Sequence, residues 1–506
     1  MSQKPVRTRF APSPTGGLHL GGVRTALYNY LFARQHGGTF VLRIEDTDQT
    51  RFVPGAEQYI QDCLAWCGIV PDESPLKEGA FGPYRQSERK PLYGDYARQL
   101  VREGHAYYAF DTPEELEAKR AVVPNFQYGL QTRMQMRNSL TLPETEVQKL
   151  LAEKAPHVIR IRMPEDKIVR FDDLIRGEVS FETALVDDKV LLKADGMPTY
   201  HLAVVVDDYL MQITHAFRGE EWLPSAPVHL LLWEYLGWKN AMPQWAHLPL
   251  ILKPDGNGKL SKRDGDRLGF PVYAMNWTDP KTGDLTRGFR ELGFLPEAFV
   301  NLLALIGWND GSDKELFSLP ELVQAFSLER VNKSGAKFDY EKAKWFNAEW
   351  IKALAADELA GSIRKILDEK GVQDVEQPFL DHIISLVRDR LVLLSDFWAQ
   401  AGFFFRAPET YDLDSIRGKW NESKTSFFRS FAADIPALDD AVFTPENLES
   451  LFKERASAAG LKPGEVMLPF RIMLVGGKFG PGVFDIAVLL GRDESASRIS
   501  TVLQKL

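Results

Sequence analysis

The sequence predicts an α/β protein with a parallel sheet, followed by an all-helical region. Residues 6–48 read as strand, glycine-rich turn, helix and strand, which is the order of a βαβ unit. From about residue 350 onward, apolar residues recur at helical spacing and strand-like runs are scarce. The 506 residues, 44% of them hydrophobic, suffice for several buried cores, and the length suggests about three domains.

The amino-terminal unit can be justified element by element. Apolar and charged residues alternate over residues 6–10, which predicts a short strand. The segment PSPTGG ends this strand, because proline cannot continue a strand ladder. A helix is expected from about Val23 to Gln35, and a second strand over residues 39–48, TFVLRIEDTD.

The turn within RFAPSPTGGLHLGG (9–22) is typical of a phosphate or nucleotide cradle. Its glycines let a ligand approach the backbone without a Cβ in the way, and the following helix N-terminus favours anions. Glu45, Asp46 and Asp48 end the second strand and should lie beside this turn, where a carboxylate suits a substrate ammonium group. Taken alone, the turn could be a plain connection and His19 a structural histidine.

A second candidate element is the basic stretch GKLSKRDGD, residues 258–266. Lys259, Lys262 and Arg263 surround Ser261 between glycines. In a nucleotidyl transfer, negative charge builds up on the α-phosphate and the leaving pyrophosphate, and a lysine ammonium stabilises it. We expect a loop rather than a helix, because a loop can bring the lysine in as the reaction proceeds. The alternative is a solvated, lysine-rich loop.

Composition narrows the class of protein. The net charge of −9 and the pI near 5.7 argue weakly against a nucleic-acid binder, although an acidic body can carry a basic face. Cys63 and Cys67 exclude a disulfide framework, and their i, i+4 spacing fits a small apolar helix face better than a metal site. No secretory signal, transit peptide or uncharged run of roughly 18 residues is visible, so we expect a cytoplasmic protein outside the membrane.

Two short segments carry a resemblance to a known class. HLGG (19–22) and KLSKR (259–263) resemble the paired HIGH and KMSKS elements of class I aminoacyl-tRNA synthetases. Longer segments are similar, in the same order, to the bacterial-type glutamyl-tRNA synthetase family: FAPSPTGGLHLGG, RIEDTD, GPYRQSER, PTYHLAVVVDD, FRGEEWL, FDYEKAKWFN and LPFRIMLVGG. The glutaminyl relatives differ in the first strand-turn and at the end of RIEDTD. The resemblance covers nearly the whole chain.

The resemblance implies a Rossmann-type parallel sheet with an inserted acceptor-binding domain, followed by an all-α anticodon-binding region. The implied boundaries are 1–101 and 198–252 for the two halves of the catalytic domain, 102–197 for the insertion, 253–350 for the KLSKR loop and stem-contact domain, and 351–506 for the anticodon-binding region. Within the insertion, His157, Arg160 and Arg162 form either one basic face towards tRNA or a solvated sheet face.

For ATP, the resemblance implies a site around the HIGH-like turn, in which Gly22 stands where HIGH has its last histidine. His19 would hydrogen-bond the phosphates, and Lys262, assisted by Lys259, would stabilise the activation transition state. The implied ATP-binding residues are Pro12, Gly16, His19, Gly21, Gly22, Glu221 and Lys262. Mg²⁺ is expected with the ATP. No zinc is expected, because AYYAFDTPEELEAK lacks the cysteines that some relatives have there.

For glutamate, the resemblance implies a clamp made of Arg9 and Arg218, whose planar guanidinium groups suit a carboxylate. The implied pocket is completed by a hydroxyl from Tyr200, by Glu45 and Ser13 for the α-ammonium group, and by Ala11. Glutamine would leave a buried guanidinium without its anion, at a cost of about 3–5 kcal/mol. Val204 stands where some relatives place an amide.

For tRNA, the resemblance implies that Arg390 reads the last anticodon base and that Arg471 and Val483 occupy other anticodon-contact positions. The alternatives are a helix surface for the arginines and core for the valine. The segment 380–400 has apolar residues at helical spacing and is expected to be helical. FFFR (403–406) could stack bases, although adjacent phenylalanines are more often core.

The implied reaction joins L-glutamate to tRNA-Glu through glutamyl-adenylate, with ATP as co-substrate and a monomer as the active form. Three alternatives remain. A small nucleotidyltransferase would not need RIEDTD or a helical carboxyl third. A tRNA-base-modifying paralogue lacks the anticodon region. Intact HLGG and KLSKR count against an inactive RNA-binding regulator.

Overall fold

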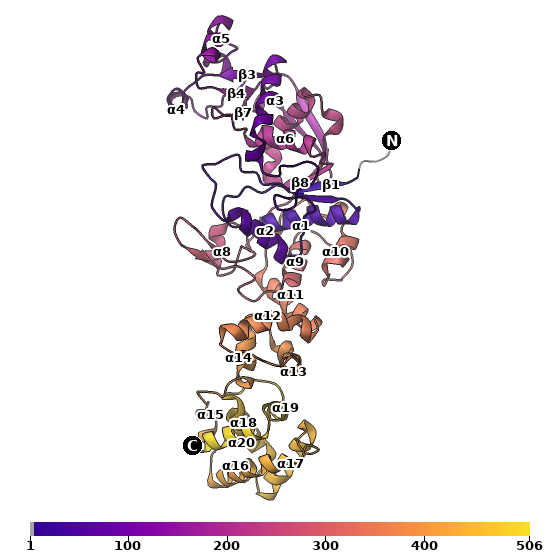
Figure 1. Cartoon of the computed structure of the whole chain (residues 1–506), viewed down its shortest axis with the longest axis vertical. Coiled ribbons are helices and arrows are strands. Elements are labelled where there is room, and N and C mark those ends of the chain that lie inside the picture. The colour runs from indigo at the N-terminus through magenta and orange to yellow at the C-terminus, as the bar shows by residue number, and fades with distance from the viewer. Residues whose placement is uncertain (1–4) are drawn as a thin grey trace. The chain divides into compact units, whose positions relative to one another are not determined.

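The computed structural model divides the chain into two compact units (Figure 1). It describes residues 5–506, apart from the side chains of Lys262, Arg263 and Asp266. The first unit comprises Met1–Glu291 and Pro296–Ala343, and the second Leu292–Leu295 and Lys344–Leu506. The predicted class, α/β with a parallel sheet and then a largely helical region, is confirmed.

The first unit is built around a six-stranded sheet. Its strand order is β2 (Thr39–Leu42), β1 (Arg7–Phe10), β8 (His215–Gly219), β9 (Gln244–Leu248), β5 (Ile168–Asp173) and β6 (Gly177–Glu182). The first five strands run parallel, and β6 pairs antiparallel with β5 at the edge. β5 and β6 lie within the segment expected as the insertion, so that segment supplies one edge of the main sheet.

Helix α1 (Leu20–Gln35) packs on β1, β2 and β8, and Figure 1 shows it next to β1 and β8. It begins at Leu20 rather than at Val23, because the His19 side chain accepts the N–H of Gly21 and caps the helix. The second strand ends at Leu42 rather than at residue 48. Bonding to the first strand continues past Leu42, because the N–H groups of Arg43 and Glu45 donate to the carbonyls of Phe10 and Pro12 at 3.0 and 2.9 Å. The regular ladder ends because Pro12 has no N–H to donate in return.

The sheet is supported by a large core. Buried apolar side chains of helices α3 (Lys90–Arg102), α6 (Tyr200–Leu210) and α7 (Ala226–Tyr235) meet β5, β8 and β9 there. The remaining helices of this unit are α2 (Ala56–Trp66), α4 (Pro113–Val122), α5 (Glu144–Ala152), α8 (Lys262–Leu268), α9 (Pro296–Leu305) and α10 (Leu319–Ala325). Short strands pair as β10 (Ile251–Leu252) with β13 (Ala336–Lys337) and β11 (Trp277–Thr278) with β12 (Leu285–Thr286).

The rest of the insertion carries a three-stranded antiparallel sheet. It consists of β3 (Ala106–Ala109), β4 (Val158–Ile161) and β7 (Val190–Leu192). Arg160 on β4 lies 4.0 Å over the ring of Tyr128 and donates to the carbonyl of Asp188 at 2.9 Å. Arg160 therefore packs inside this domain and does not join His157 and Arg162 in one basic face.

The second unit is helical. After α11 (Tyr340–Ala353), which begins in the first unit, its helices are α12 (Ala356–Glu369), α13 (Gln377–Val387), α14 (Phe397–Ala401), α15 (Asp414–Arg417), α16 (Glu422–Asp434), α17 (Pro445–Ala458), α18 (Pro463–Val475), α19 (Val483–Leu490) and α20 (Arg492–Leu503). Residues 344–506, all of which the structure describes, contain no strand. The expected helix over 380–400 is broken into α13 and α14, because the carboxylate of Asp396 accepts the N–H groups of Val392 and Leu393. Phe403 and Phe404 are buried, in agreement with core.

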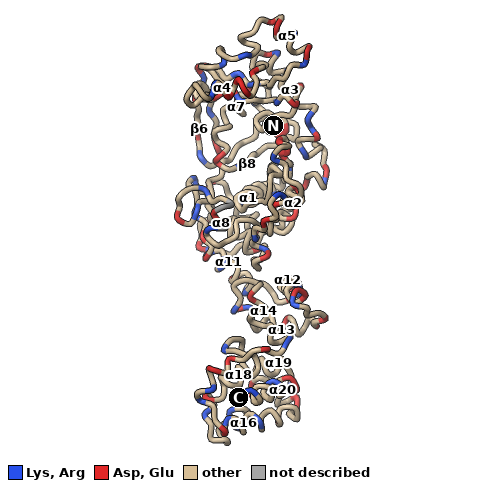
Figure 2. Tube along the Cα trace, turned by 90° about the vertical axis from the view of Figure 1, so that its left-hand side faces the viewer, with Lys and Arg blue, Asp and Glu red and all other residues tan. Residues whose placement is uncertain are grey.

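Charge is distributed over both units. Figure 2 shows Lys and Arg interspersed with Asp and Glu along each of them, so the net charge of −9 does not come from one acidic block. Within the described part of the chain, every helix is too short or too polar to span a membrane.

Candidate active site

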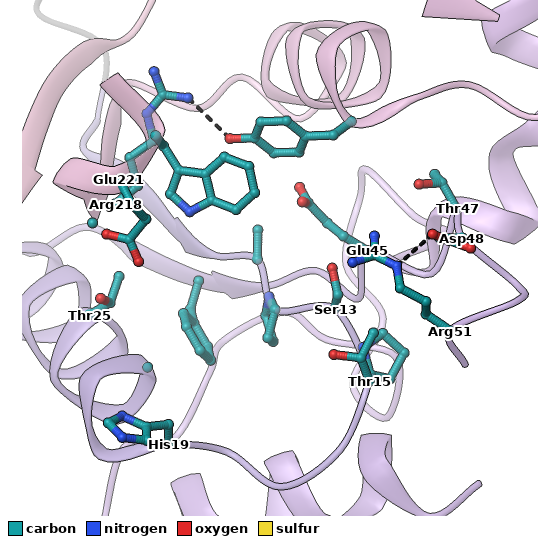
Figure 3. A pocket seen from close by; sticks show the side chains of 18 of the residues that line it. Ser13, Thr15, His19, Thr25, Glu45, Thr47, Asp48, Arg51, Arg218 and Glu221 are labelled. Atoms are coloured by element: carbon teal, nitrogen blue, oxygen red, sulfur yellow. Dashed lines mark hydrogen bonds and ion pairs between the residues drawn. The ribbon is translucent and has the colours of Figure 1, made fainter. Parts of the chain in front are cut away.

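A cavity of about 1220 Å³ opens in the first unit, where strands β1, β2, β8 and β9 end. Most residues expected to bind ATP and glutamate line it: Arg9, Ala11, Pro12, Ser13, His19, Gly21, Gly22, Glu45, Tyr200, Arg218, Glu221 and Lys259. Gly16 is not part of the lining, and the side chain of Lys262 lies outside the described residues. Figure 3 shows His19 at the start of α1, across the cavity from Arg218 and Glu45.

The glycine-rich turn forms one wall of this cavity. Gly16 has a φ of 139°, a conformation that side chains rarely adopt, and a Cβ on Gly17 would lie 2.7 Å from the ring of Tyr273. The Nδ1 of His19 accepts the N–H of Gly21 at 3.1 Å. One N–H of the helix N-terminus is therefore already used by the cap, and the positive end of the α1 dipole faces the cavity.

The basic stretch differs from the expected loop, because helix α8 begins at Lys262. Ser261 caps it: the Asp264 carboxylate accepts the Ser261 N–H at 3.0 Å and its hydroxyl at 2.6 Å. Lys259 precedes this cap, and its Nζ lies 2.6 Å from Oε1 of Glu221. Two residues expected near ATP thus meet at the exposed rim of the cavity.

Arg9 is already neutralised by a buried carboxylate. Its Nε and Nη2 donate to the two oxygens of Asp208 at 3.1 and 3.2 Å. Arg43 donates to Asp208 at 2.8 Å and to Glu45 at 3.0 Å. Burial opposes ionisation of Asp208, but Arg9 and Arg43 outweigh it and hold the pKa of this carboxyl below its usual range. Burial raises the pKa of Glu45, against the charge of Arg43.

Arg218 is held differently, by neutral groups. Its Nε donates to Nε2 of His247 at 2.9 Å, and its Nη1 donates to the Tyr200 hydroxyl and to Nδ1 of His229, both at 3.1 Å. Its guanidinium also lies 4.9 Å over the ring of Trp245. Among the described residues, no carboxylate lies within ion-pair distance of Arg218.

Sequence reasoning missed several partners of these arginines. The missed residues are Arg43, Asp173, Asp208, His229 and His247, all of them buried and outside the cavity lining. Asp208 ends PTYHLAVVVDD, and His247 interrupts an apolar strand, so a polar residue inside an apolar run was the available signal. Val204, where some relatives have an amide, is buried in the α6 core and does not line the cavity.

Two histidines beside Arg218, the half-buried His201 and the buried His229, are neutral. Nδ1 of His201 lies 3.2 Å from Nε2 of His229. Burial lowers the pKa of His201 to about 4. Burial, together with the charge of Arg218, holds the pKa of His229 well below the usual histidine range.

The free energy of unfolding is therefore expected to fall as the pH drops from 6.5 towards 4. An unfolded histidine is protonated below pH 6.5, whereas folded His201 is protonated only below about 4, so unfolding takes up a proton in this window. For His201 the loss amounts to about 2 kcal/mol between pH 7 and pH 5. Thermal unfolding at both pH values measures it. His201→Asn is the control, because asparagine keeps an acceptor but does not titrate; an equal loss in both proteins would contradict the prediction.

The anticodon-contact candidates lie in the second unit. Arg471 on α18 donates to the carbonyls of Phe479, Gly480 and Pro481 at 3.1, 3.2 and 2.6 Å. Burial, and then the charge of Arg390, lower the pKa of Arg471. Arg390 is exposed, whereas Val483 is 3% exposed and belongs to the core. The structure thus leaves Arg390 accessible, while Arg471 holds the segment that leads into α19.

The chain matches known protein families over nearly its whole length. A family model described as "tRNA synthetases class I (E and Q), catalytic domain" matches residues 5–345, and one described as "Anticodon binding domain" matches residues 342–503. Fold and site therefore define a class I aminoacyl-tRNA synthetase of the glutamate and glutamine group. A glutamate–tRNA ligase of Porphyromonas gingivalis is 53% identical over 507 residues, covering 100% of both chains. This chain belongs to the glutamate–tRNA ligases, the enzymes that charge tRNA-Glu.

Further relatives agree over the full length. A glutamate–tRNA ligase of Bacteroides fragilis is 50% identical over 509 residues, with 100% of both chains covered. A crystal structure of a glutamate tRNA ligase from Elizabethkingia meningosepticum in complex with its amino acid has a TM-score of 0.93 and 48% identity, and covers 99% of this chain and 100% of that one. The match to an anticodon-binding domain also removes the small nucleotidyltransferase and the shorter base-modifying paralogue as alternatives.

Proposed function

We propose that the cavity of this ligase activates L-glutamate with ATP and then passes the glutamyl group to the 3′ end of tRNA-Glu. In the first step, an α-carboxylate oxygen of glutamate attacks the α-phosphorus of ATP, and the bond to pyrophosphate breaks. In the second, a terminal ribose hydroxyl of the tRNA attacks the glutamyl carbonyl and AMP leaves. Positioning and charge stabilisation carry both steps, because neither needs a protein nucleophile.

One observation supports this assignment above all. Arg218 is a buried guanidinium without a carboxylate partner among the described residues, and it lies in the same cavity as the N-terminus of α1. An anionic side chain and a triphosphate can therefore be held side by side. The proposed glutamate contacts are Arg9, Ala11, Ser13, Glu45, Tyr200 and Arg218.

The ATP side of the cavity is proposed to use the glycine-rich turn and the basic stretch. The proposed contacts are Pro12, Gly16, His19, Gly21, Gly22, Glu221, Lys259 and Lys262. Over the described residues there is no group of three or more His, Cys, Asp or Glu side chains that could hold a metal ion. We expect Mg²⁺ to arrive on the phosphates of ATP.

The decisive experiment is charging of purified tRNA with labelled glutamate. The proposal requires glutamate and ATP to be consumed together and tRNA-Glu to be the better acceptor. Charging of tRNA for glutamine in a parallel reaction measures how well the enzyme uses this second tRNA as an acceptor. A protein that binds both tRNAs but charges neither would instead be an RNA-binding regulator.

Replacing Arg390 with glutamine is expected to improve charging of the glutamine acceptor relative to tRNA-Glu. A guanidinium can both stack and donate to base edges, and the exposed Arg390 is proposed to favour the last anticodon base of tRNA-Glu. The expected change in the ratio of kcat/KM values is about tenfold, the loss of one base contact. Arg388→Gln, on the same turn, is the matched control, and an unchanged ratio in Arg390→Gln would refute the assignment.

Zinc chelation is expected to leave charging unaffected. The start of the insertion lacks the cysteines of zinc-binding relatives, and both cysteines, Cys63 and Cys67, are buried on α2 or at its end. The measurement is the charging rate before and after dialysis against a zinc-selective chelator, with Mg²⁺ kept in excess. Loss of activity that added zinc restores would overturn this expectation.

The protein is further proposed to work as a cytoplasmic monomer. Sedimentation equilibrium at charging concentrations, with and without tRNA, tests the oligomeric state directly.

A further inference from the structure

The guanidinium of Arg218 is enclosed by acceptors that carry no charge. Arg218 is 7% exposed, and its three hydrogen-bond partners are His247, His229 and the hydroxyl of Tyr200. Its remaining terminal nitrogen, Nη2, is buried and has no hydrogen-bond partner in the structure. Arg9, in the same cavity, is by contrast matched by both oxygens of Asp208. The two arginines of the proposed clamp thus differ in their charge balance.

The contact to Arg218 determines which ring nitrogen of His247 carries the proton. An arginine has only donors, so Nε2 of His247 must present a lone pair and the ring proton must sit on Nδ1. That proton points at Oδ2 of Asp173, 2.6 Å away, and both side chains are fully buried. The other oxygen of Asp173 accepts the N–H groups of Ile175 and Arg176, each at 3.0 Å, which fixes the carboxylate.

The three residues therefore form a directed chain, from Asp173 through His247 to Arg218. Asp173 is on β5, His247 on β9 and Arg218 on β8, so adjacent strands of the sheet set the spacing. A carboxylate in place of the imidazole would neutralise Arg218 before any substrate arrives. A neutral imidazole orients the guanidinium but leaves its charge for the ligand.

We propose that His247, oriented by Asp173, is a positioning residue that presents Arg218 to the substrate as an uncompensated cation and so sets the preference for glutamate over glutamine. This inference rests on the assignment of Arg218 to the glutamate site proposed above. Glutamate brings the missing anion to Nη2, whereas the amide of glutamine leaves the buried cation unmatched.

Two variants of His247 separate its two contacts. In His247→Gln, the amide oxygen reaches the place of Nε2 and can still accept from Arg218. In His247→Asn, the shorter amide reaches only the Nδ1 side, towards Asp173. The readouts are kcat and KM for glutamate, and the inhibition constant of glutamine, in steady-state tRNA charging by the full chain. Thermal unfolding of each variant is recorded alongside.

We expect His247→Asn to raise the KM for glutamate at least about tenfold with kcat little changed, the effect of losing one charge-assisted hydrogen bond. The ratio of the glutamine inhibition constant to this KM should fall correspondingly. His247→Gln should restore both values to within about threefold of the wild type. Wild-type values in both variants, or a loss of kcat at unchanged KM, would overturn the proposal.

A measurement on the wild type keeps the proposal testable if a variant does not fold. ¹⁵N NMR of the histidine-labelled chain should show His247 neutral, with its proton on Nδ1, throughout pH 6–8; a proton on Nε2 would overturn the proposal. Failure of the underlying site assignment is distinguishable. If Arg218→Gln leaves the KM for glutamate unchanged, the proposed site is wrong, whereas an effect in Arg218→Gln without one in His247→Asn rejects only the role of His247.

Discussion

Replacing Arg218 with glutamine is expected to lower kcat/KM for glutamate about 150-fold to 4000-fold, through a higher KM. Substitution removes a buried cavity cation that has no carboxylate partner among the described residues, and a broken buried charge pair costs about 3–5 kcal/mol. Steady-state charging of tRNA-Glu at varied glutamate concentration measures this loss. Arg218→Lys should fall between wild type and Arg218→Gln, because an ammonium keeps the charge but not the planar fork.

The matched control is Arg170→Gln. Arg170 belongs to β5 of the same sheet, but its side chain is exposed and lies 3.6 Å from Glu178 on the neighbouring strand. Exposed pairs of this kind contribute little to stability, so charging should remain at the wild-type level. If the two glutamine variants behaved alike, the assignment of Arg218 to the substrate carboxylate would have to be abandoned.

Replacing Lys262 with alanine is expected to reduce glutamate-dependent pyrophosphate exchange, with tRNA present, at least ~100-fold. The second lysine of KLSKR is proposed to meet the charge that develops on the α-phosphate and the leaving pyrophosphate. Its backbone opens helix α8, and the preceding residues reach the cavity through the contact of Lys259 with Glu221. Removal of a single donor to a developing oxyanion has effects of this size in other enzymes.

Lys281→Ala is the control for this prediction. Lys281 is an exposed lysine in the turn between β11 and β12, so its loss removes one positive charge from the same unit without touching the cavity. Retained exchange in Lys262→Ala would refute the catalytic role of this lysine.

Local sequence patterns predicted those elements that depend only on residues close together in the sequence. The alternation over residues 6–10, the glycine-rich turn and the apolar spacing of α1 are such patterns, and the structure contains the expected strand, turn and helix. The helix over the basic stretch could also have been predicted from the sequence. Ser261 and Asp264 stand three residues apart, the spacing of a capping box, although the flanking glycines favoured a loop.

Features that depend on distant residues were not predictable in this way. The regular ladder of the second strand stops early because Pro12, just after the neighbouring strand, accepts the N–H of Glu45 but has no N–H to donate in return. Asp208 reaches Arg9 across 199 positions, and no local pattern encodes that distance. Resemblance to a family identified both arginines of the proposed clamp, but their different charge balance emerged only from three-dimensional contacts.

The position of Asp173 has a consequence for how this enzyme could be reduced in size. Asp173 belongs to β5, inside the stretch 102–197 that sequence reasoning treated as an addition to the core fold. A shortened enzyme lacking that stretch would lose the sheet edge and, with it, the carboxylate behind His247. If His247 has the role proposed above, excision would therefore weaken the binding of glutamate, and a working catalytic fragment would have to retain β5.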